Sequence, residues 1–353
     1  MKILHIIDPA YFQTHKKTIS ELILSLSLSK VEQKVYTREG EKLGWIDTVC
    51  EVVGWKVAKS GKLKGLSNKL KTWFLFSSFR PDIVIKYGLD ARVIANGVGG
   101  VQISFINEKE NLSTFENTDY IMTNVDDVLS YVKSHGYSGT RSFLLPSFVY
   151  EYPNIPDIVK KDYFIPEKSD VVYVGGTFLK NIGFEWAFDA LSIIQNTYFF
   201  IAGSGPDDEY VKDCALRVNL KARSRFIPEI EKSMKALADV KFAFLPFDDP
   251  ELSKYILEAM LQKKLVVTVK NSQSEEFISD GKTGFFVPRT DMYLIKKKLK
   301  EVIALSDKER EKIVNDAFEY AQKYIAPVII PAYLQMFEEL VRRYNSRKNL
   351  LNN

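Results

Sequence analysis

Acidic side chains gather between positions 248 and 258, where the sequence DDPELSKYILE leads from a proline-broken loop into a short helix. A carboxylate at a helix start and at the end of a strand can hold sugar hydroxyls, and the unpaired backbone N–H groups of a first helical turn can hold a phosphate. Asp249, Glu251 and Glu258 are the candidate acids, and the alternative for Glu258 is an ordinary surface position on a helix. The segment predicts a site for a ligand that carries both hydroxyls and phosphate.

Two glycine-bearing turns precede this segment, each between an apolar strand and a helix. Gly175-Gly176-Thr177 forms a strand–turn–helix phosphate cradle, and Lys180 adds a positive charge suited to a diphosphate. In Gly203-Ser204-Gly205 the small residues let the backbone approach a ligand or a packed helix. The alternative is that Lys180 is a solvated lysine and that the second glycine pair makes only a turn.

Short apolar strands alternate with helical stretches along the whole chain, and these elements must position the turns. Strands are predicted over 2–7, 34–37, 82–86, 101–105 and 120–123, and again over 171–174, 198–202, 224–227, 241–245 and 265–268. Helices are predicted between them, among them 18–28, 125–135, 230–237 and 331–347. Apolar strands spaced by helices indicate parallel sheets covered on both faces, so we expect an α/β fold with two doubly wound, Rossmann-like domains facing across a cleft.

The boundary between the two halves is predicted at 151–169. This stretch holds Pro153, Pro156 and Pro166 among mixed charges without a clear period, which is typical of a linker. Residues 1–150 then form the first domain and 170–326 the second.

Composition excludes several classes of protein. The 353 residues carry 49 basic and 45 acidic side chains, a net charge of +4 that is too small to argue for nucleic acid. Two cysteines, Cys50 and Cys214, build neither a disulfide framework nor a zinc site, so we expect no metal and a reducing cytoplasm. The start MKILHIIDPA is expected to be a buried strand and not a signal peptide, and no apolar run reaches the ~18 residues that span a bilayer.

The order of these segments resembles the nucleotide-sugar site of retaining glycosyltransferases of the GT-B fold, family 4. Gly203-Ser204-Gly205-Pro206 is similar to a Gly-x-Gly-Pro turn of that family, and Leu257-Glu258-Ala259-Met260 to the second of two glutamates with seven residues between them. Asp280-Gly281-Lys282-Thr283-Gly284 resembles its Asp-Gly-x-x-Gly turn, which is structural. The resemblance covers most of the chain; it is good from 171 to 288 and loose before 150.

The resemblance implies a retaining, metal-independent hexosyltransferase that moves a sugar from a nucleoside diphosphate sugar to a glycan or lipid-linked acceptor, with no cofactor. It implies that Glu258 binds the ribose hydroxyls and that Lys180, with the two glycine turns, binds the diphosphate. Counting back from Glu258 reaches Pro250, so either Asp249 or Glu251 would face the donor sugar. The terminal residues 327–353 would cross back onto the first domain.

Further contacts follow from the same resemblance. The loop at Ile227 and Pro228 would lie along the nucleobase through backbone groups. Ser253-Lys254 stands where the family has a glycine-bearing loop, and Lys254 would offset the arginine that the family carries near Gly176 and this chain lacks. Asn107 stands where the family often has a histidine; it can bond a sugar hydroxyl but cannot act as a base.

The histidines of this chain lie elsewhere. His5 is expected in the core, His135 at a helix end, and His15 is a weak candidate in the first loop. The missing arginine and histidine leave two alternatives to a transferase: a binding or partner subunit without turnover, and a nucleotide-sugar epimerase, which shares the fold.

A basic, aromatic stretch at 55–80 carries seven lysines and arginines and no acid, interleaved with tryptophan and phenylalanine. This pattern is typical of an element on an anionic membrane surface, and the alternative is a core helix with a solvated face. No base-reading motif accompanies the charge, so nucleic acid is not an expected partner. The expected location is the cytoplasm, with peripheral binding at the inner membrane face.

Overall fold

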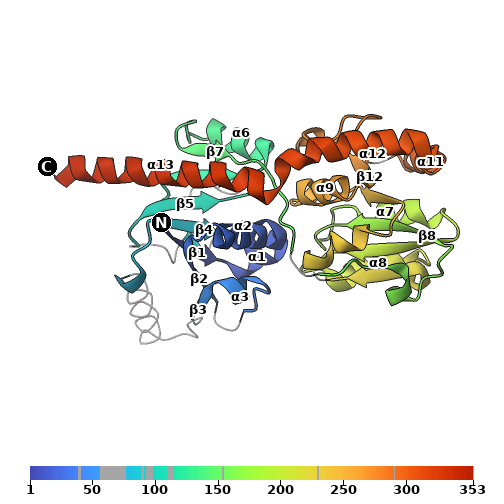
Figure 1. The fold of residues 1–353 in the computed structure, drawn as a ribbon, viewed down its shortest axis with the longest axis horizontal. Coiled ribbons are helices and arrows are strands. Elements are labelled where there is room, and N and C mark those ends of the chain that lie inside the picture. Colours follow the sequence, from blue (N-terminus) through green and yellow to red (C-terminus); the bar gives the residue numbers. More distant parts are fainter. Residues whose placement is uncertain are drawn as a thin grey trace. The chain divides into compact units, whose positions relative to one another are not determined.

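The structure is a computed structural model that describes residues 1–38, 41–55, 77–88, 91–92, 98–109, 115, 117–152, 155–228, 230–289 and 291–352. The chain divides into two compact units (Figure 1). Unit 1 comprises Met1–Pro146 and Ala326–Asn353, and unit 2 comprises Ser147–Ile325.

The described part of unit 1 contains a parallel sheet of seven strands in the order β3-β2-β1-β4-β5-β6-β7. The strands are β1 (Lys2–Ile7), β2 (Glu32–Arg38), β3 (Glu51–Trp55), β4 (Ile83–Tyr87), β5 (Val101–Phe105), β6 (Tyr120–Thr123) and β7 (Ser142–Leu144). Its helices are α1 (Pro9–Thr14), α2 (Lys16–Leu28), α3 (Ile46–Val49), α6 (Asp126–Ser134) and α13 (Ala326–Asn352). The order of strands reverses beside β1, which is where open α/β sheets place their ligands.

The described part of unit 2 contains a parallel sheet of six strands in the order β10-β9-β8-β11-β12-β13. The strands are β8 (Asp170–Gly175), β9 (Thr197–Ala202), β10 (Ser224–Ile227), β11 (Phe242–Leu245), β12 (Leu265–Val269) and β13 (Phe285–Val287). The α-helices are α7 (Phe184–Ser192), α8 (Asp208–Arg217), α9 (Leu252–Leu261), α10 (Ser272–Glu275), α11 (Met292–Ile303) and α12 (Asp307–Ala321). Short 3-10 helices are η2 (Lys160–Tyr163), η3 (Lys221–Arg223), η4 (Ile230–Lys232), η5 (Lys235–Leu237) and η6 (Gln322–Tyr324).

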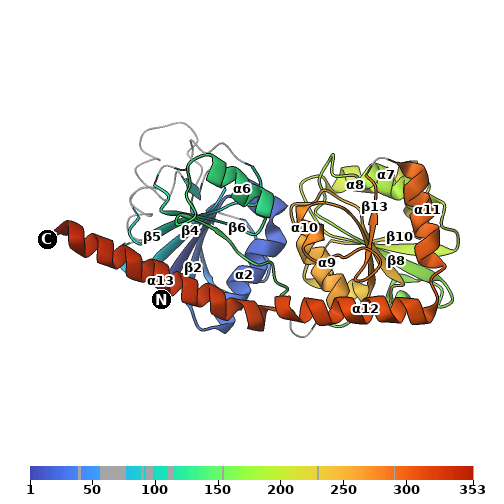
Figure 2. The same ribbon diagram turned by 90° about the horizontal axis from the view of Figure 1, so that it is seen from above.

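Helices cover both faces of the unit 2 sheet, as Figure 2 shows. One apolar core lies between β8 and the helices α7, α8 and α11, and it includes Val172 and Phe188. The other lies between the opposite face of β8 and the helices α9 and α12, and it includes Val171 and Ile256. Successive strand residues point to opposite faces, so the apolar run of β8 supplies both cores. The predicted α/β class with two doubly wound units is confirmed.

Two predicted helices have different limits in the structure. The helix predicted over 230–237 is wrong, because the chain forms the separate 3-10 helices η4 and η5 there. The terminal helix begins at Ala326 and not at Pro331, which lies inside it. Buried Ile330, Tyr333 and Phe337 pack this helix on unit 1, so packing outweighs the hydrogen bond that a proline removes.

The stretch predicted as a linker packs on unit 2. Ile158 and Ile165 are buried in its second core, and η2 lies between them. The basic stretch at 55–80 lies almost wholly outside the described residues, which stop at 55 and resume at 77. Across the described part of the chain, no helix combines the length and the apolar character that crossing a membrane requires.

Candidate functional site

The two glycine turns meet at the carboxyl edge of the unit 2 sheet. The Gly176 amide donates to the carbonyl of Ala202 at 3.1 Å, and the Phe178 amide donates to that of Ser204 at 3.1 Å. A Cβ atom on Gly203, whose φ is +148°, would lie 1.9 Å from the Gly176 carbonyl oxygen. The contact therefore requires glycine at position 203 for both its backbone angle and its lack of a side chain.

Asp249, which follows β11, joins the first turn to the start of α9. One carboxylate oxygen accepts the Thr177 amide at 2.5 Å, and the other accepts the Thr177 hydroxyl at 2.9 Å and the Glu251 amide at 2.7 Å. Only 1% of Asp249 is exposed. Burial raises the pKa of Asp249 to about 6, although these hydrogen bonds act in the opposite direction. Asp249 is thus a buried anchor of the site.

The backbone N–H groups at the start of α9 already have partners. Leu252 donates to the Asp249 carbonyl, Lys254 to the Glu251 carbonyl, and Ser253 to the side-chain oxygen of Gln273 at 3.3 Å. The expectation that this helix start offers unpaired N–H groups to a phosphate is therefore wrong. The negative charge of the Asp249 carboxylate lies near the N-terminus of α9, where it interacts favourably with the positive end of the helix dipole.

Glu251, the other candidate for the donor sugar, occupies the N-cap position of α9 and is 3% exposed. Gln273 was not predicted as a site residue. Its side-chain nitrogen donates to the Asp249 carbonyl at 2.8 Å, and its side-chain oxygen accepts the Ser253 amide at 3.3 Å. It stands in α10 after the next strand, so no local pattern links it to the acidic loop.

Glu258 lies in the second half of α9 and is 1% exposed, so the interpretation as a surface glutamate is wrong. Its two carboxylate oxygens accept the Ser233 hydroxyl at 2.8 and 3.1 Å. Ser233 lies between η4 and η5, where the sequence predicts a continuous helix. Burial, together with the charge of Glu258, raises the pKa of the neighbouring Tyr173. Glu258 thus belongs to a buried polar cluster beneath the end of β8.

The two candidate cations for a diphosphate have different environments. Lys180 is 56% exposed at its side chain, and its ammonium lies 3.3 Å from the Asp207 carboxylate. Hydrogen bonds from Lys180 lower the pKa of Asp207. Lys254 is buried, with its ammonium 2.5 Å from the carbonyl oxygen of Phe148 and 4.2 Å from the centre of that ring. Of these two lysines, Lys180 is the one that is accessible to solvent.

The remaining unit 2 candidates mainly form contacts with other segments of the same unit. The Ser253 hydroxyl lies 3.0 Å from that of Ser147, so the start of α9 is tied to the first residues of the unit. The carbonyl of buried Ile227 accepts the Gly203 amide at 3.0 Å, while Pro228 is exposed. Gly205 lies against the backbone of Phe178, where a Cβ atom would come within 2.4 Å of the carbonyl oxygen.

The 280–284 turn has the structural role that its sequence predicts. Gly281 has a φ of +72°, and the Asp280 carboxylate accepts the Phe286 amide at 2.9 Å. A Cβ atom on Gly284 would come within 2.9 Å of the Val266 carbonyl oxygen. The turn seats β13 beside β12.

In unit 1, Asn107 follows β5 and is 4% exposed. Its side-chain oxygen accepts the Asn124 amide at 3.2 Å, and its own backbone amide donates to the Tyr11 hydroxyl at 2.9 Å. The His15 ring stacks on Tyr11 with 4.1 Å between centroids, and burial lowers the pKa of His15 to about 4. The carboxyl edge of the unit 1 sheet therefore holds a neutral imidazole and an amide.

The other two histidines lie where the sequence predicts. His5 is buried in β1 and pairs with Gln33 at 2.8 Å. His135 follows α6 at its C-cap, with its ring nitrogen 2.8 Å from the Tyr131 carbonyl.

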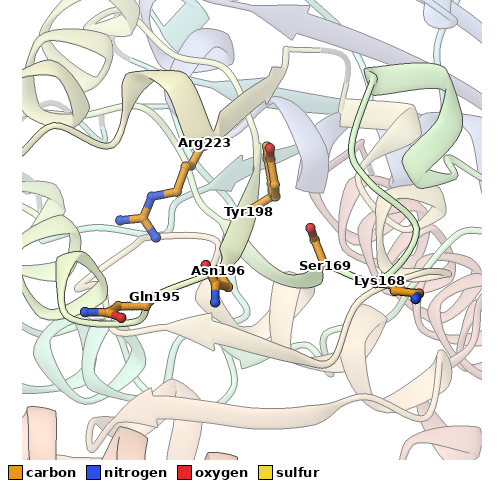
Figure 3. Close-up of a pocket in the computed structure, with 6 residues that line it drawn as sticks. All are labelled: Lys168, Ser169, Gln195, Asn196, Tyr198 and Arg223. Atoms are coloured by element: carbon orange, nitrogen blue, oxygen red, sulfur yellow. The ribbon is translucent and has the colours of Figure 1, made fainter.

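Two pockets lie at opposite edges of unit 2. One of about 300 Å³ adjoins the first glycine turn; Trp186 and Asn181 line it, and Arg289 pairs there with Asp248 through two contacts of 2.6 and 2.7 Å. The other, of about 610 Å³, is drawn in Figure 3; it lies just before β8, β9 and β10, so it is at the amino edge. None of the predicted site residues lines either pocket.

The two doubly wound units match solved glycosyltransferases of the GT-B fold. HepE of Anabaena, in complex with UDP and glucose, superposes with a TM-score of 0.76 at 15% identity, covering 96% of this chain and 99% of that one. WaaG, a glycosyltransferase involved in lipopolysaccharide biosynthesis, superposes with a TM-score of 0.70 at 15% identity, again covering 96% and 99%.

Sequence comparison leads to the family. Residues 157–320 match the family model of the glycosyl transferases group 1. The lipopolysaccharide core biosynthesis glycosyltransferase LpsE of Rhizobium meliloti is 22% identical over 329 residues, which are 89% of this chain and 93% of LpsE. LpsD of the same organism, which carries the same description, is 25% identical over 240 residues, 64% of this chain and 66% of LpsD. The match over residues 157–320, the two relatives and the shared fold support a divergent GT-B glycosyltransferase of group 1.

Proposed function

We propose that this glycosyltransferase moves a hexosyl group from a nucleoside diphosphate sugar to a saccharide acceptor of the lipopolysaccharide core, with retention of configuration and without a metal ion. The observation that carries the proposal is the Asp249 anchor, which holds the Gly175–Thr177 turn against the start of α9. A turn fixed in this way needs little reorganisation when a charged donor binds, and such preorganisation lowers the barrier to transfer.

The acids and the exposed lysine have separate roles in this proposal. Lys180 leaves Asp207 to meet the diphosphate, because an exposed ion pair is weak and is easily exchanged for a more highly charged partner. Glu258, oriented by Ser233, accepts hydrogen bonds from the ribose hydroxyls. Asp249 is a positioning residue and Glu251 faces the donor sugar. Ile227 and Pro228 border the nucleobase.

The transfer step then depends on position and charge. The acceptor oxygen attacks the anomeric carbon from the face that the leaving diphosphate vacates, and the diphosphate takes the acceptor proton. The bond from the anomeric carbon to the diphosphate oxygen breaks as the new glycosidic bond forms. Asn107 of unit 1 contributes a hydrogen bond to a sugar hydroxyl and no proton transfer.

The relatives support the choice of donor and acceptor to test first. LpsE and LpsD are described as enzymes of lipopolysaccharide core biosynthesis, and HepE has been solved with UDP-glucose. A UDP-hexose is therefore the first donor, and a lipopolysaccharide core acceptor is the first acceptor. An acceptor of this kind is made at the inner membrane face, so the location that goes with this proposal is the cytoplasm at that face.

A donor screen tests the proposal. The melting temperature is measured with UDP-, GDP- and ADP-hexoses, with and without EDTA, and transfer is then followed by mass spectrometry with the anomer assigned by NMR. One nucleotide sugar should raise the melting temperature by mass action. Lys180→Ala should remove most of that rise, whereas Lys212→Ala, which removes an exposed ion-paired lysine on α8, should not. The absence of any stabilising nucleotide sugar contradicts the proposal.

A second candidate function is that of a GT-B binding or partner subunit without turnover. The observation in its favour is that the amides of Gly176, Thr177 and Phe178 and those at the start of α9 all have internal partners. Donor hydrolysis, measured with and without candidate partner proteins, separates the two. Stabilisation by a nucleotide sugar with neither hydrolysis nor transfer favours the subunit.

A further inference from the structure

A pocket of about 220 Å³ lies in unit 1, away from the residues that the proposed transfer uses. Its walls come from the residues just before β6 and β7 and from the distal part of α13, which runs along this unit in Figure 1. It is therefore at the amino edge of the sheet, whereas ligands of doubly wound domains bind at the carboxyl edge. The lining residues are Asp119, Tyr120, Thr140, Arg141, Arg343 and Arg347.

Three guanidinium groups share this pocket with one carboxylate. Arg141 donates to the backbone carbonyls of Asp119 and Thr118, at 3.1 and 2.7 Å, and within the described part of the chain no acid forms an ion pair with it. The Asp119 carboxylate accepts the Gln102 amide at 2.8 Å. The pocket thus has an excess of positive charge.

The helix does not supply enough acid to balance that excess. Arg343 shares Glu339 with Arg342, at 2.8 and 3.1 Å, so one carboxylate serves two guanidiniums. Among the described residues, Arg347 forms no ion pair. Arginines brought together without matching acids repel one another, and a bound anion removes that repulsion.

The volume and the donors select the kind of anion. The pocket is smaller than the ~300–1,000 Å³ of drug-sized ligand sites, so it admits a small group. Guanidinium groups present parallel N–H donors that match the oxygens of a phosphate, and the hydroxyl of Thr140 adds a neutral donor.

We propose that this pocket binds a phosphate group, carried either by a lipid headgroup or by a soluble phosphorylated molecule. Arg141 forms the fixed wall, and Arg343 and Arg347 close on the phosphate from α13. The site is separate from the donor site of unit 2, so the proposal holds or fails independently of the proposed transfer.

Footprinting with phenylglyoxal tests the site directly, because mass spectrometry reads each arginine separately. The protein is modified in inorganic phosphate and in chloride of equal ionic strength. At a phosphate concentration about four times its Kd, modification of Arg343 and Arg347 should slow about fivefold by mass action, while Arg342 on the same helix should not change. Equal protection of all three arginines, or protection of none, overturns the proposal.

Vesicle sedimentation then separates the two sources of phosphate. Vesicles of phosphatidylcholine with and without phosphatidate are compared for the double variant Arg343→Gln/Arg347→Gln and for the matched control Arg342→Gln/Lys348→Gln, which removes the same charge from the same helix. Phosphatidate-dependent binding that only the pocket variant loses identifies a lipid headgroup. Phosphate protection in the footprint without vesicle binding identifies a soluble ligand. Equal loss in both variants, with no selective protection in the footprint, rejects the pocket.

Discussion

The carboxyl edges of the two sheets are built in different ways. In unit 2, backbone amides, glycines and the Asp249 carboxylate close the turns on one another. In unit 1, Gly88 allows a similar approach, since a Cβ atom there would lie 2.6 Å from that of Asp8, but the contacts beyond it are side chains. Tyr11 stacks on His15 and its hydroxyl accepts the Asn107 amide.

Hydrogen-bond satisfaction also differs between the edges. In unit 1 the Nε2 atom of His15 and the side-chain amide nitrogen of Asn107 are buried and have no hydrogen-bond partner among the described residues. Buried polar atoms without a partner cost free energy, and a ligand that reaches them recovers it. The turns of the unit 2 edge are preorganised by hydrogen bonds, whereas these two nitrogen atoms of the unit 1 edge are available to a ligand. Four experiments, each with its own control or matched variant, test this comparison.

Gly203→Ala should have the largest effect. The new Cβ atom would meet the Gly176 carbonyl oxygen at 1.9 Å, at a backbone φ of +148°. We expect a loss of stability above about 4 kcal/mol or no folded unit 2, because neither turn can move without breaking its hydrogen bonds. Urea unfolding followed by circular dichroism measures it.

Gly136→Ala is the control for backbone strain alone. Gly136 has a φ of +97°, but a Cβ atom there would have open space, with no neighbouring atom of the described chain within 4 Å. This substitution should cost only about 1 kcal/mol. If Gly203→Ala costs no more than this control, the turns of unit 2 are not tightly joined.

Asp249→Ala is expected to rank second. It removes the acceptor of three hydrogen bonds and leaves the Thr177 and Glu251 amides buried, at a cost of about 2–4 kcal/mol. Asn107→Ala in unit 1 removes a weaker acceptor and should cost about 1–2 kcal/mol. Comparing the two unfolding midpoints measures how much more preorganised the unit 2 edge is, and equal costs would remove that distinction.

The two edges should respond to pH with opposite signs. Asp249 has a pKa of about 6 in the folded chain and an ordinary value of 3.8, so its contribution is present below pH 4 and is lost as pH rises to 6, about 3 kcal/mol in all. His15 has a folded pKa of about 4 and an ordinary value of 6.5, so its contribution is present above pH 6.5 and is lost as pH falls to 4, again about 3 kcal/mol.

Asp249→Asn and His15→Gln isolate these contributions, because neither amide titrates. Stability is measured between pH 4 and 7 for each variant and for the parent chain. Relative to the parent, Asp249→Asn should lose stability on acidification and His15→Gln should gain it. Parallel pH curves for the three proteins would show that neither group titrates where its burial predicts.

The two lysines should give the smallest and most selective effects. Lys254→Met leaves the Phe148 carbonyl without its donor and should cost about 1–3 kcal/mol. Lys180→Ala breaks an exposed ion pair and should change stability by less than about 0.5 kcal/mol, while weakening donor binding about tenfold. Thermal unfolding measures the effect on stability, and donor titration measures the effect on binding. If Lys180→Ala loses as much stability as Lys254→Met, the division into a donor-binding lysine and a structural lysine is wrong.

Local patterns in the sequence determined the α/β class, the ten predicted strands and the positions of the glycine turns, but not the edge strands β3, β7 and β13. Gly203 and Gly281 could be predicted because positive φ angles favour glycine at both positions, and at Gly203 the close approach of Gly176 also excludes a side chain. The apolar strand runs are readable because a parallel sheet buries both faces.

Only the tertiary structure decided which side chains serve those turns. Asp249 reaches Thr177 across 72 positions, and Lys254 reaches Phe148 across 106. Ser233 holds Glu258 from a segment predicted to be helical, and α13 begins before its proline because unit 1 packs against it. Such partners depend on how distant elements pack together, so no local pattern in the sequence predicts them. The same packing buries Asp249, which raises its pKa, and buries Lys254.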